Sequence, residues 1–258
     1  MRLTIFDVGH GQCALATAQN GEAVLIDCGQ SPENRPSDLL PARGIKRLAR
    51  LFVTNFDQDH VSDLPRLAQT VDLSCAQFHR NRSIDVPSLR EVKLEAGPLT
   101  GAMTAAIGMH GQYVHAAPAP LPTPGITWEE FWNPYPTFRD TNNLSLVVFL
   151  RVANLTAVFP GDLEVAGWRV LLQRADFRAA LGTVSIFVAS HHGRENGYCA
   201  EVFDFCHPLV VVFSDDVIAY ESQRMASTYA PYAIGVTFNG DPRKVMTTRQ
   251  DGTFWWDV

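Results

Sequence analysis

Three side chains that bind metals or carry protons fall within four consecutive residues of this chain. Asp57, Asp59 and His60 follow the apolar residues 51–53, where a predicted buried strand passes into a loop. Carboxylates this close repel one another unless they share a cation or a proton. The segment therefore predicts a metal or acid–base site at the end of this strand.

Two later apolar runs end in the same kind of chemistry. Residues 158–159 are followed by Asp162, and residues 186–188 are followed by His191 and His192. Three strand ends that each carry ligand-type side chains can meet at one edge of a sheet. This pattern predicts a dinuclear metal site.

The composition is that of an ordinary globular protein with ample length for a core. The chain has 258 residues, of which 46% are hydrophobic and 19% are charged, as in typical domains. The net charge of −6 argues against non-specific binding along a long stretch of duplex DNA, because such binding requires many phosphates to be neutralised by basic residues. It does not exclude a nuclease, because a bound cation supplies local positive charge. No apolar run approaches the roughly 18 residues of a membrane span, so no membrane association is expected.

The cysteines favour a reducing compartment. There are five, an odd number, and none has the Cys-x-x-Cys spacing. The first residues are too few and too acidic for a secretory signal. We therefore expect reduced thiols and a cytoplasmic location.

Turn signals and apolar runs outline the elements that would position the site. Three short strands are expected within the first thirty residues, with a hairpin signal at Asn20-Gly21. A buried antiparallel hairpin is expected over residues 144–159, and strands alternate with helices from residue 184 to 213. The proline-rich loop 116–124 is too short for an interdomain linker. We predict a single domain over residues 1–258, with 72–135 as a variable insert or a lid over the site.

Six segments occur in the order found in one family of hydrolases. They are 6–11 (Phe-Asp-Val-Gly-His-Gly), 24–29 (Val-Leu-Ile-Asp-Cys-Gly), 55–60 (Asn-Phe-Asp-Gln-Asp-His), 142–145 (Asn-Asn-Leu-Ser), 161–164 (Gly-Asp-Leu-Glu) and 191–193 (His-His-Gly). With these motifs the chain resembles the metallo-β-lactamase fold superfamily, and within it a stand-alone version of the ComEC-type competence hydrolase domain. The resemblance implies an α+β fold, a four-layer αβ/βα sandwich with the metal site at one edge between the sheets.

The resemblance also implies a set of ligands. Asp59 and His60 would bind one metal, Asp57 would serve the other, and Asp162 would bridge the two. Either His191 or His192 would complete the shell, and we favour His191 because it lies immediately past the strand. Asp59 and His192 are also expected to take part in catalysis, in which a hydroxide held between the metals attacks phosphorus or a carbonyl carbon.

Three motif positions depart from the family pattern. Asn55 replaces the first histidine of the metal motif, Gln12 replaces an acidic residue, and Arg194 replaces a serine. His10 stands where the family usually has glutamine, and it either supplies the imidazole lost at position 55 or bonds to the backbone of its loop.

Three further polar residues lie within these motifs. Asn142 and Asn143 would position substrate or hold a turn. Asp27 ends a predicted strand, which is typical of a turn-stabilising hydrogen-bond acceptor.

The ligand set bears on the metal and on the reaction. Three carboxylates with one or two imidazoles favour one or two ions of Mn²⁺ or Zn²⁺, with Mg²⁺ as an alternative. The first hypothesis is a phosphodiesterase or nuclease with a nucleic acid or nucleotide as substrate, and a protein partner is left open. A catalytically degenerate binding or regulatory subunit is the second hypothesis. The third is an ester or thioester hydrolase, which would need an apolar acyl pocket.

Overall fold

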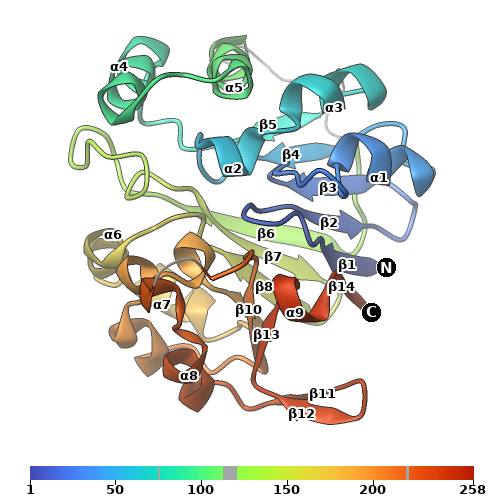
Figure 1. Cartoon of the computed structure of the whole chain (residues 1–258), viewed down its shortest axis with the longest axis vertical. Helices are drawn as coiled ribbons and strands as arrows, with labels where there is room; N and C mark the ends of the chain where they lie inside the picture. Colours follow the sequence, from blue (N-terminus) through green and yellow to red (C-terminus); the bar gives the residue numbers. More distant parts are fainter. Residues whose placement is uncertain (75, 113–120, 219–220) are drawn as a thin grey trace.

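Two six-stranded sheets lie at the centre of the molecule (Figure 1). The computed structural model describes residues 1–74, 76–112, 121–218 and 221–258. The first sheet has the order β14-β1-β2-β3-β4-β5 and the second β13-β10-β9-β8-β7-β6. The strands of the first sheet are β1 (Arg2–Ile5), β2 (Ala14–Thr17), β3 (Ala23–Ile26), β4 (Arg50–Phe52), β5 (Gln77–His79) and β14 (Phe254–Asp257). The strands of the second sheet are β6 (Ile126–Phe131), β7 (Val147–Val152), β8 (Leu155–Phe159), β9 (Ile186–Val188), β10 (Val210–Phe213) and β13 (Val245–Thr247). A separate ribbon consists of β11 (Val236–Phe238) and β12 (Asp241–Arg243).

Alternating side chains along the strands build the layers. On β3, Val24 and Ile26 belong to the core between the two sheets, together with Leu150 of β7. The intervening Leu25 belongs to a second core on the outer face of the first sheet. Successive side chains of a strand point to opposite faces of the sheet. A fully apolar strand such as β3 is therefore buried only where another layer packs against each face of the sheet.

Helices supply that cover on the outer face of each sheet (Figure 1). The first sheet carries α1 (Pro36–Ala42), α2 (Gln58–Val61), α3 (Leu64–Thr70), α4 (Val86–Ala96) and α5 (Gly101–Gln112), and the second carries α6 (Val165–Leu171), α7 (Ala175–Leu181) and α8 (Ala226–Tyr229). The remaining short helices are α9 (Thr248–Asp251) and the 3₁₀ helices η1 (Ser190–Gly193), η2 (Glu195–Gly197), η3 (Ala200–Asp204), η4 (Glu221–Gln223) and η5 (Ala230–Tyr232). The layers therefore run helix, sheet, sheet, helix.

The expected local elements are present. The first three strands pair antiparallel in sequence, and β7 pairs antiparallel with β8 as the predicted hairpin. Within 72–135, β5 pairs with β4 at the edge of the first sheet and β6 with β7 at the edge of the second. This region thus contributes a strand to each sheet. Its role as a lid stays a prediction, and residues 113–120 of the proline-rich stretch lie outside the described residues.

Four cysteines can be placed in this fold. Cys13, Cys28, Cys199 and Cys206 are buried free thiols, whereas Cys75 lies outside the described residues. None of the helices in the described ranges is both long enough and apolar enough to cross a membrane.

Candidate metal centre

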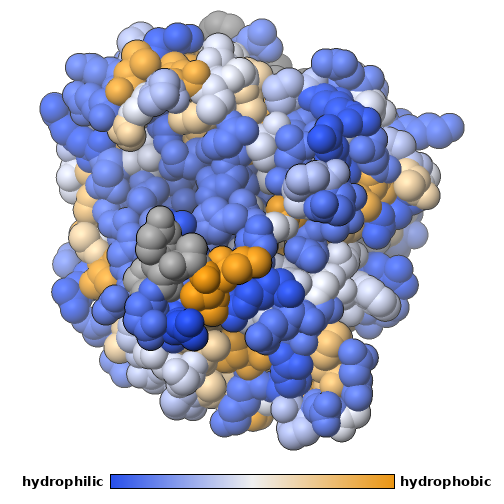
Figure 2. Space-filling model, in the orientation of Figure 1, coloured by the Kyte–Doolittle hydropathy of each residue, from blue (hydrophilic) through white to orange (hydrophobic). Residues whose placement is uncertain are grey.

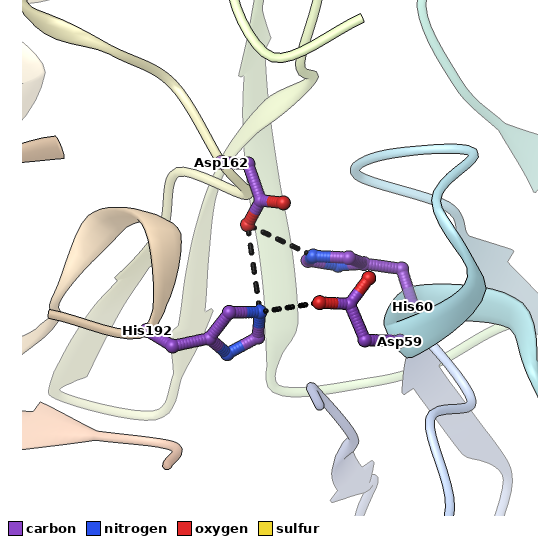
Figure 3. Close-up of side chains that lie close together, drawn as sticks. All are labelled: Asp59, His60, Asp162 and His192. Carbon is purple, nitrogen blue, oxygen red and sulfur yellow. Dashed lines mark hydrogen bonds and ion pairs between the residues drawn. The ribbon is translucent and has the colours of Figure 1, made fainter. Parts of the chain in front are cut away.

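The ends of three strands meet where the two sheets approach each other. The segment after β4 carries Asp59 and His60 on the short helix α2, the turn after β8 carries Asp162, and η1 after β9 carries His192. Figure 3 shows the four side chains pointing toward one another. Each offers one ligand-type atom, and these atoms all lie within 4.8 Å of one another. We call Asp59, His60, Asp162 and His192 the four-residue cluster.

Close backbone packing holds α2 in place. The amide of Gln12 donates to the carbonyl of Asp59 at 3.2 Å, and the amide of Cys28 donates to the carbonyl of His60 at 2.8 Å. A Cβ atom added to Gly29 would lie 2.2 Å from the carbonyl oxygen of Asp59. The loops after β1 and β3 therefore press directly against the helix that carries two of the cluster residues.

Asp27 orients the imidazole of His60. Its Oδ2 lies 2.9 Å from His60 Nδ1, and its Oδ1 accepts the amide of Thr54 at 2.7 Å. On the other side of the ring, His60 Nε2 lies 2.9 Å from Asp162 Oδ1. A carboxylate behind a histidine fixes the ring and makes it a more basic metal ligand. The sequence predicted only a turn acceptor at Asp27, although the pairing of Ile26 with Phe52 in adjacent parallel strands is what brings Asp27 beside Thr54.

The cluster holds opposite charges in close contact. Burial lowers the pKa of His60, but the charges of Asp162 and Asp27 outweigh burial and raise it well above its usual value. Burial likewise raises the pKa of Asp162, yet the charge and hydrogen bond of His60 bring it below its usual value. Protons on the imidazoles thus balance the carboxylates, and a cation can replace those protons.

His192 provides the clearest sign that a cation fits. Its Nδ1 lies 2.8 Å from the carbonyl oxygen of Ser214, an acceptor only, so Nδ1 carries a proton. Nε2 is buried and has no hydrogen bond of regular geometry among the described residues, although two carboxylates lie within ion-pair distance of it. It lies 3.2 Å from Asp59 Oδ2 and 3.6 Å from Asp162 Oδ1. In the neutral ring the lone pair of Nε2 would face the negative oxygens of two carboxylates. A metal ion bound between these three atoms would remove the repulsion.

The structure places His192, and not the favoured His191, beside Asp59, His60 and Asp162. His191 and His192 both have left-handed backbone conformations, with φ of 51° and 56°, and their ring centroids lie 6.4 Å apart. His192 faces Asp59 and Asp162, whereas His191 lies beside Glu164 and Arg194, with His191 Nε2 3.4 Å from Arg194 Nη1. The position of each histidine relative to the end of β9 did not predict this orientation, because the strained turn determines which of the two rings points toward Asp59 and Asp162.

Asp57 also lies outside the cluster. One of its oxygens forms an ion pair with Lys93 of α4, and the other accepts a hydrogen bond from Thr141 Oγ1 at 3.1 Å. The predicted role of Asp57 as a ligand of a second metal is therefore not matched by its position. Lys93 was missed at the sequence level, because it lies 36 residues farther along the chain in a helix with no motif.

The departures from the family pattern lie around the cluster. Asn55 Nδ2 is 3.3 Å from both Asp162 Oδ2 and Asn142 Oδ1. His10 Nε2 lies 3.6 Å from Asp59 Oδ2 and 3.2 Å from Arg194 Nη2. Burial, followed by the charge of His192, lowers the pKa of His10 to about 4, so His10 is a neutral acceptor for Arg194. Its proposed replacement of an imidazole at position 55 stays a prediction.

The two neighbouring asparagines have different contacts. Asn142 Nδ2 donates to Glu164 Oε1 at 3.0 Å. Asn143 Oδ1 accepts the amide of Gly167 at 2.8 Å, and its own amide donates to Asp140. Asn143 therefore holds the turn against α6, and Asn142 is the one that faces the site.

A cleft of about 690 Å³ opens above the cluster. Its walls are His10, Asp57, Gln58, Asp59, Val92, Glu95, Ala96, Arg139, Asp140, Thr141, Asn142, Asp162, His191 and Arg194. Two of these, Val92 and Ala96 of α4, are apolar. The face shown in Figure 2 is mostly hydrophilic, with one apolar group over α4 and another near the middle of the view. The cleft thus suits a polar substrate.

Comparison with known proteins identifies the fold. No protein-family model matches the chain, and no curated protein sequence matches it. Igni18, a metallo hydrolase from Ignicoccus hospitalis, has a similar structure with a TM-score of 0.51 and 14% identity over 100% of both chains. A diphosphatase of the PhnP family has a TM-score of 0.51 and 10% identity, covering 100% of this chain and 97% of the other. CmlA, a diiron β-hydroxylase from Streptomyces venezuelae, has a TM-score of 0.56 and 14% identity over 99% of this chain but 54% of CmlA. The mixed fold with two sheets is thereby confirmed as the metallo-β-lactamase type.

Proposed function

We propose that this chain is a metal-dependent hydrolase whose metal is held by the four-residue cluster. The observation that carries the proposal is the buried Nε2 of His192, which faces the carboxylates of Asp59 and Asp162 at 3.2 and 3.6 Å with no hydrogen bond of regular geometry among the described residues. Two carboxylates and two imidazoles form a donor set that suits Zn²⁺ or Mn²⁺, with Mg²⁺ a weaker match. The similarity to a metallo hydrolase and to a diiron enzyme supports this reading.

The residues of the chain have separate tasks in this proposal. A divalent cation, when bound, polarises a substrate oxygen and lowers the pKa of a water molecule. Asp27 and the carbonyl of Ser214 hold the two imidazoles in the orientation that presents Nε2 to the cluster. Asp59 and Asp162 both line the cleft, and Asp59 is the more exposed of the two, with 23% of its side chain exposed against 4% for Asp162.

Arg194 indicates the charge of the substrate. Its guanidinium contacts the rings of His10 and His191, and no carboxylate of the described residues forms an ion pair with it. Arg139 is exposed in the same cleft. Guanidinium groups bind phosphate oxygens strongly and with defined geometry. We therefore propose a phosphodiester substrate, a nucleotide or a nucleic acid, and the similarity to a diphosphatase supports phosphoryl chemistry.

The cleft argues against an acyl substrate. A thioester or ester of a long acyl chain needs an apolar pocket, and the two apolar wall residues lie side by side on α4. We further propose that the enzyme acts in the cytoplasm, and its association with a partner protein is left to experiment.

A substrate panel tests this proposal. The purified chain is loaded with Mn²⁺ or Zn²⁺ and given bis-(4-nitrophenyl) phosphate, single-stranded DNA, 4-nitrophenyl acetate and an acyl thioester. We expect phosphodiester hydrolysis that chelator abolishes and that Asp162→Asn reduces to background. Ester hydrolysis without phosphodiester hydrolysis would support the acyl class instead. No turnover by a metal-loaded chain would support the degenerate binding subunit.

A further inference from the structure

We propose that this chain binds one divalent cation, because Lys93 and Asn55 fill the place of a second. The inference rests on the metal centre proposed above and concerns the side chains on its outer flank. A second cation beside the cluster would need lone pairs from Asp57, Asn55 and the outer oxygen of Asp162. In the structure, N–H and O–H donors already meet the oxygens of Asp57 and the outer oxygen of Asp162, and Asn55 turns its N–H, not its oxygen, toward Asp162.

Lys93 forms an ion pair with the carboxylate of Asp57. The lysine side chain is 1% exposed, although it is cationic, and it ends in an ion pair with Asp57. Its Nζ also lies 3.2 Å from Thr141 Oγ1, which in turn donates to the second oxygen of Asp57 at 3.1 Å. Both oxygens of Asp57 are therefore engaged. Moving Asp57 to a metal would leave a buried ammonium group without its counterion, which is strongly unfavourable.

Asn55 covers the outer oxygen of Asp162. Its Nδ2 donates to Asp162 Oδ2 and to Asn142 Oδ1, both at 3.3 Å. Since Asn142 uses its own Nδ2 to donate to Glu164, the amide of Asn55 must present its nitrogen to both acceptors. Its oxygen is buried without a partner among the described residues, which is the cost of holding the N–H toward Asp162. Oδ1 of Asp162 alone faces His60 and His192.

The number of bound metals tests the inference directly. Chelator-stripped protein is titrated with Mn²⁺ and, separately, with Zn²⁺, and the bound equivalents are read by native mass spectrometry and calorimetry. We expect one equivalent, and the Mn²⁺ protein should show the six-line electron paramagnetic resonance spectrum of an isolated ion. Two equivalents, or a spectrum of two coupled ions, would overturn this inference and leave the metal centre standing. No bound metal would overturn the metal centre as well.

A paired set of variants tests the assigned cause. Asn55→His with Lys93→Met supplies an imidazole and frees Asp57, and we expect this double variant to bind a second equivalent. The exposed Lys46 gives a matched control, since the Lys46→Met protein should still bind one equivalent of metal. A folded double variant, judged by circular dichroism, that remains at one equivalent would show that Lys93 and Asn55 do not exclude the second ion. The wild-type count stands as a test even if the double variant fails to fold.

Discussion

At the scale of single residues, two groups outside the cluster determine how its imidazoles lie. Asp27 fixes His60 through Nδ1, and the carbonyl of Ser214 fixes His192 in the same way. The strand-end carboxylates Asp59 and Asp162 were predictable from the sequence, because each follows an apolar run. The orienting groups were not, since their contacts depend on which strands pair and on how the loops cross.

Replacing Asp27 tests this orienting role. Asn at position 27 tolerates the left-handed backbone there, with φ of 55°, but its neutral amide is a weaker acceptor for the Nδ1–H of His60 and leaves the ring a less basic ligand. We expect Asp27→Asn to weaken metal binding by roughly 10- to 100-fold, the effect usual for such partners. Calorimetric titration with Zn²⁺ measures it. Asp63→Asn is the control, because Asp63 is a buried carboxylate that accepts hydrogen bonds from Ser37 instead; equal losses in both variants would refute a specific role for Asp27.

Replacing Arg194 tests the charge of the substrate. We expect Arg194→Ala to raise KM for a phosphodiester roughly tenfold or more, because a hydrogen bond to a charged group is lost, while the bound metal stays unchanged. Steady-state kinetics with bis-(4-nitrophenyl) phosphate measure this, and Arg194→Lys should recover part of the loss. Arg169→Ala removes an exposed guanidinium that pairs with Glu201 and should have no effect. An unchanged KM in Arg194→Ala would contradict phosphate binding at this position.

At the scale of elements, the site is made of loops pressed against one another at the ends of β4, β8 and β9. The strands themselves were predictable, because their apolar runs are bounded by turn residues, and the hairpin of β7 and β8 follows the expected pattern. The choice of His192 over His191 was not predictable, because it depends on consecutive left-handed residues in η1. Nor did any pattern predict that α4 would place Lys93 against Asp57.

A methyl group between these loops should disturb the site. In Gly29→Ala the new Cβ would lie 2.2 Å from the carbonyl oxygen of Asp59, so α2 must shift. We expect the free energy of unfolding to fall by about 1–3 kcal/mol, with a parallel loss of metal affinity, measured by urea denaturation and calorimetry. Gly108→Ala is the matched control: it lies in α5 with nothing within 4 Å, and alanine there should stabilise the helix by up to about 1 kcal/mol. A stable Gly29→Ala protein with normal affinity would contradict this close packing.

At the scale of the whole molecule, the cluster joins the two halves of the sandwich. Asp59 and His60 belong to the half built on the first sheet, and Asp162 and His192 belong to the half built on the second (Figures 1 and 3). The fold class and its four layers were predictable from the ordered motifs. A bound metal would add a link between layers that apolar packing and hydrogen bonds such as those of Asn81 also hold together.

Metal should therefore stabilise the complete fold. A ligand that binds only the folded state at about 100 times its Kd adds about 2.7 kcal/mol, which corresponds to a rise of roughly 5–10 °C in Tm for a chain of this size. Differential scanning calorimetry of the stripped protein with and without Zn²⁺ measures the shift. The variant His192→Ala should lose most of it, and an equal shift in that variant would mean that the metal binds elsewhere.

The most direct test of the central claim is the position of the metal in a crystal. Anomalous diffraction at the absorption edge of Zn or Mn locates the ion without assumptions about its ligands. We predict one peak, bound at roughly 2.0–2.2 Å by the carboxylates of Asp59 and Asp162 and by Nε2 of His60 and of His192. A peak bound to Asp57 or His191, or no peak in metal-soaked crystals, would contradict the assignment of the four-residue cluster as the metal centre.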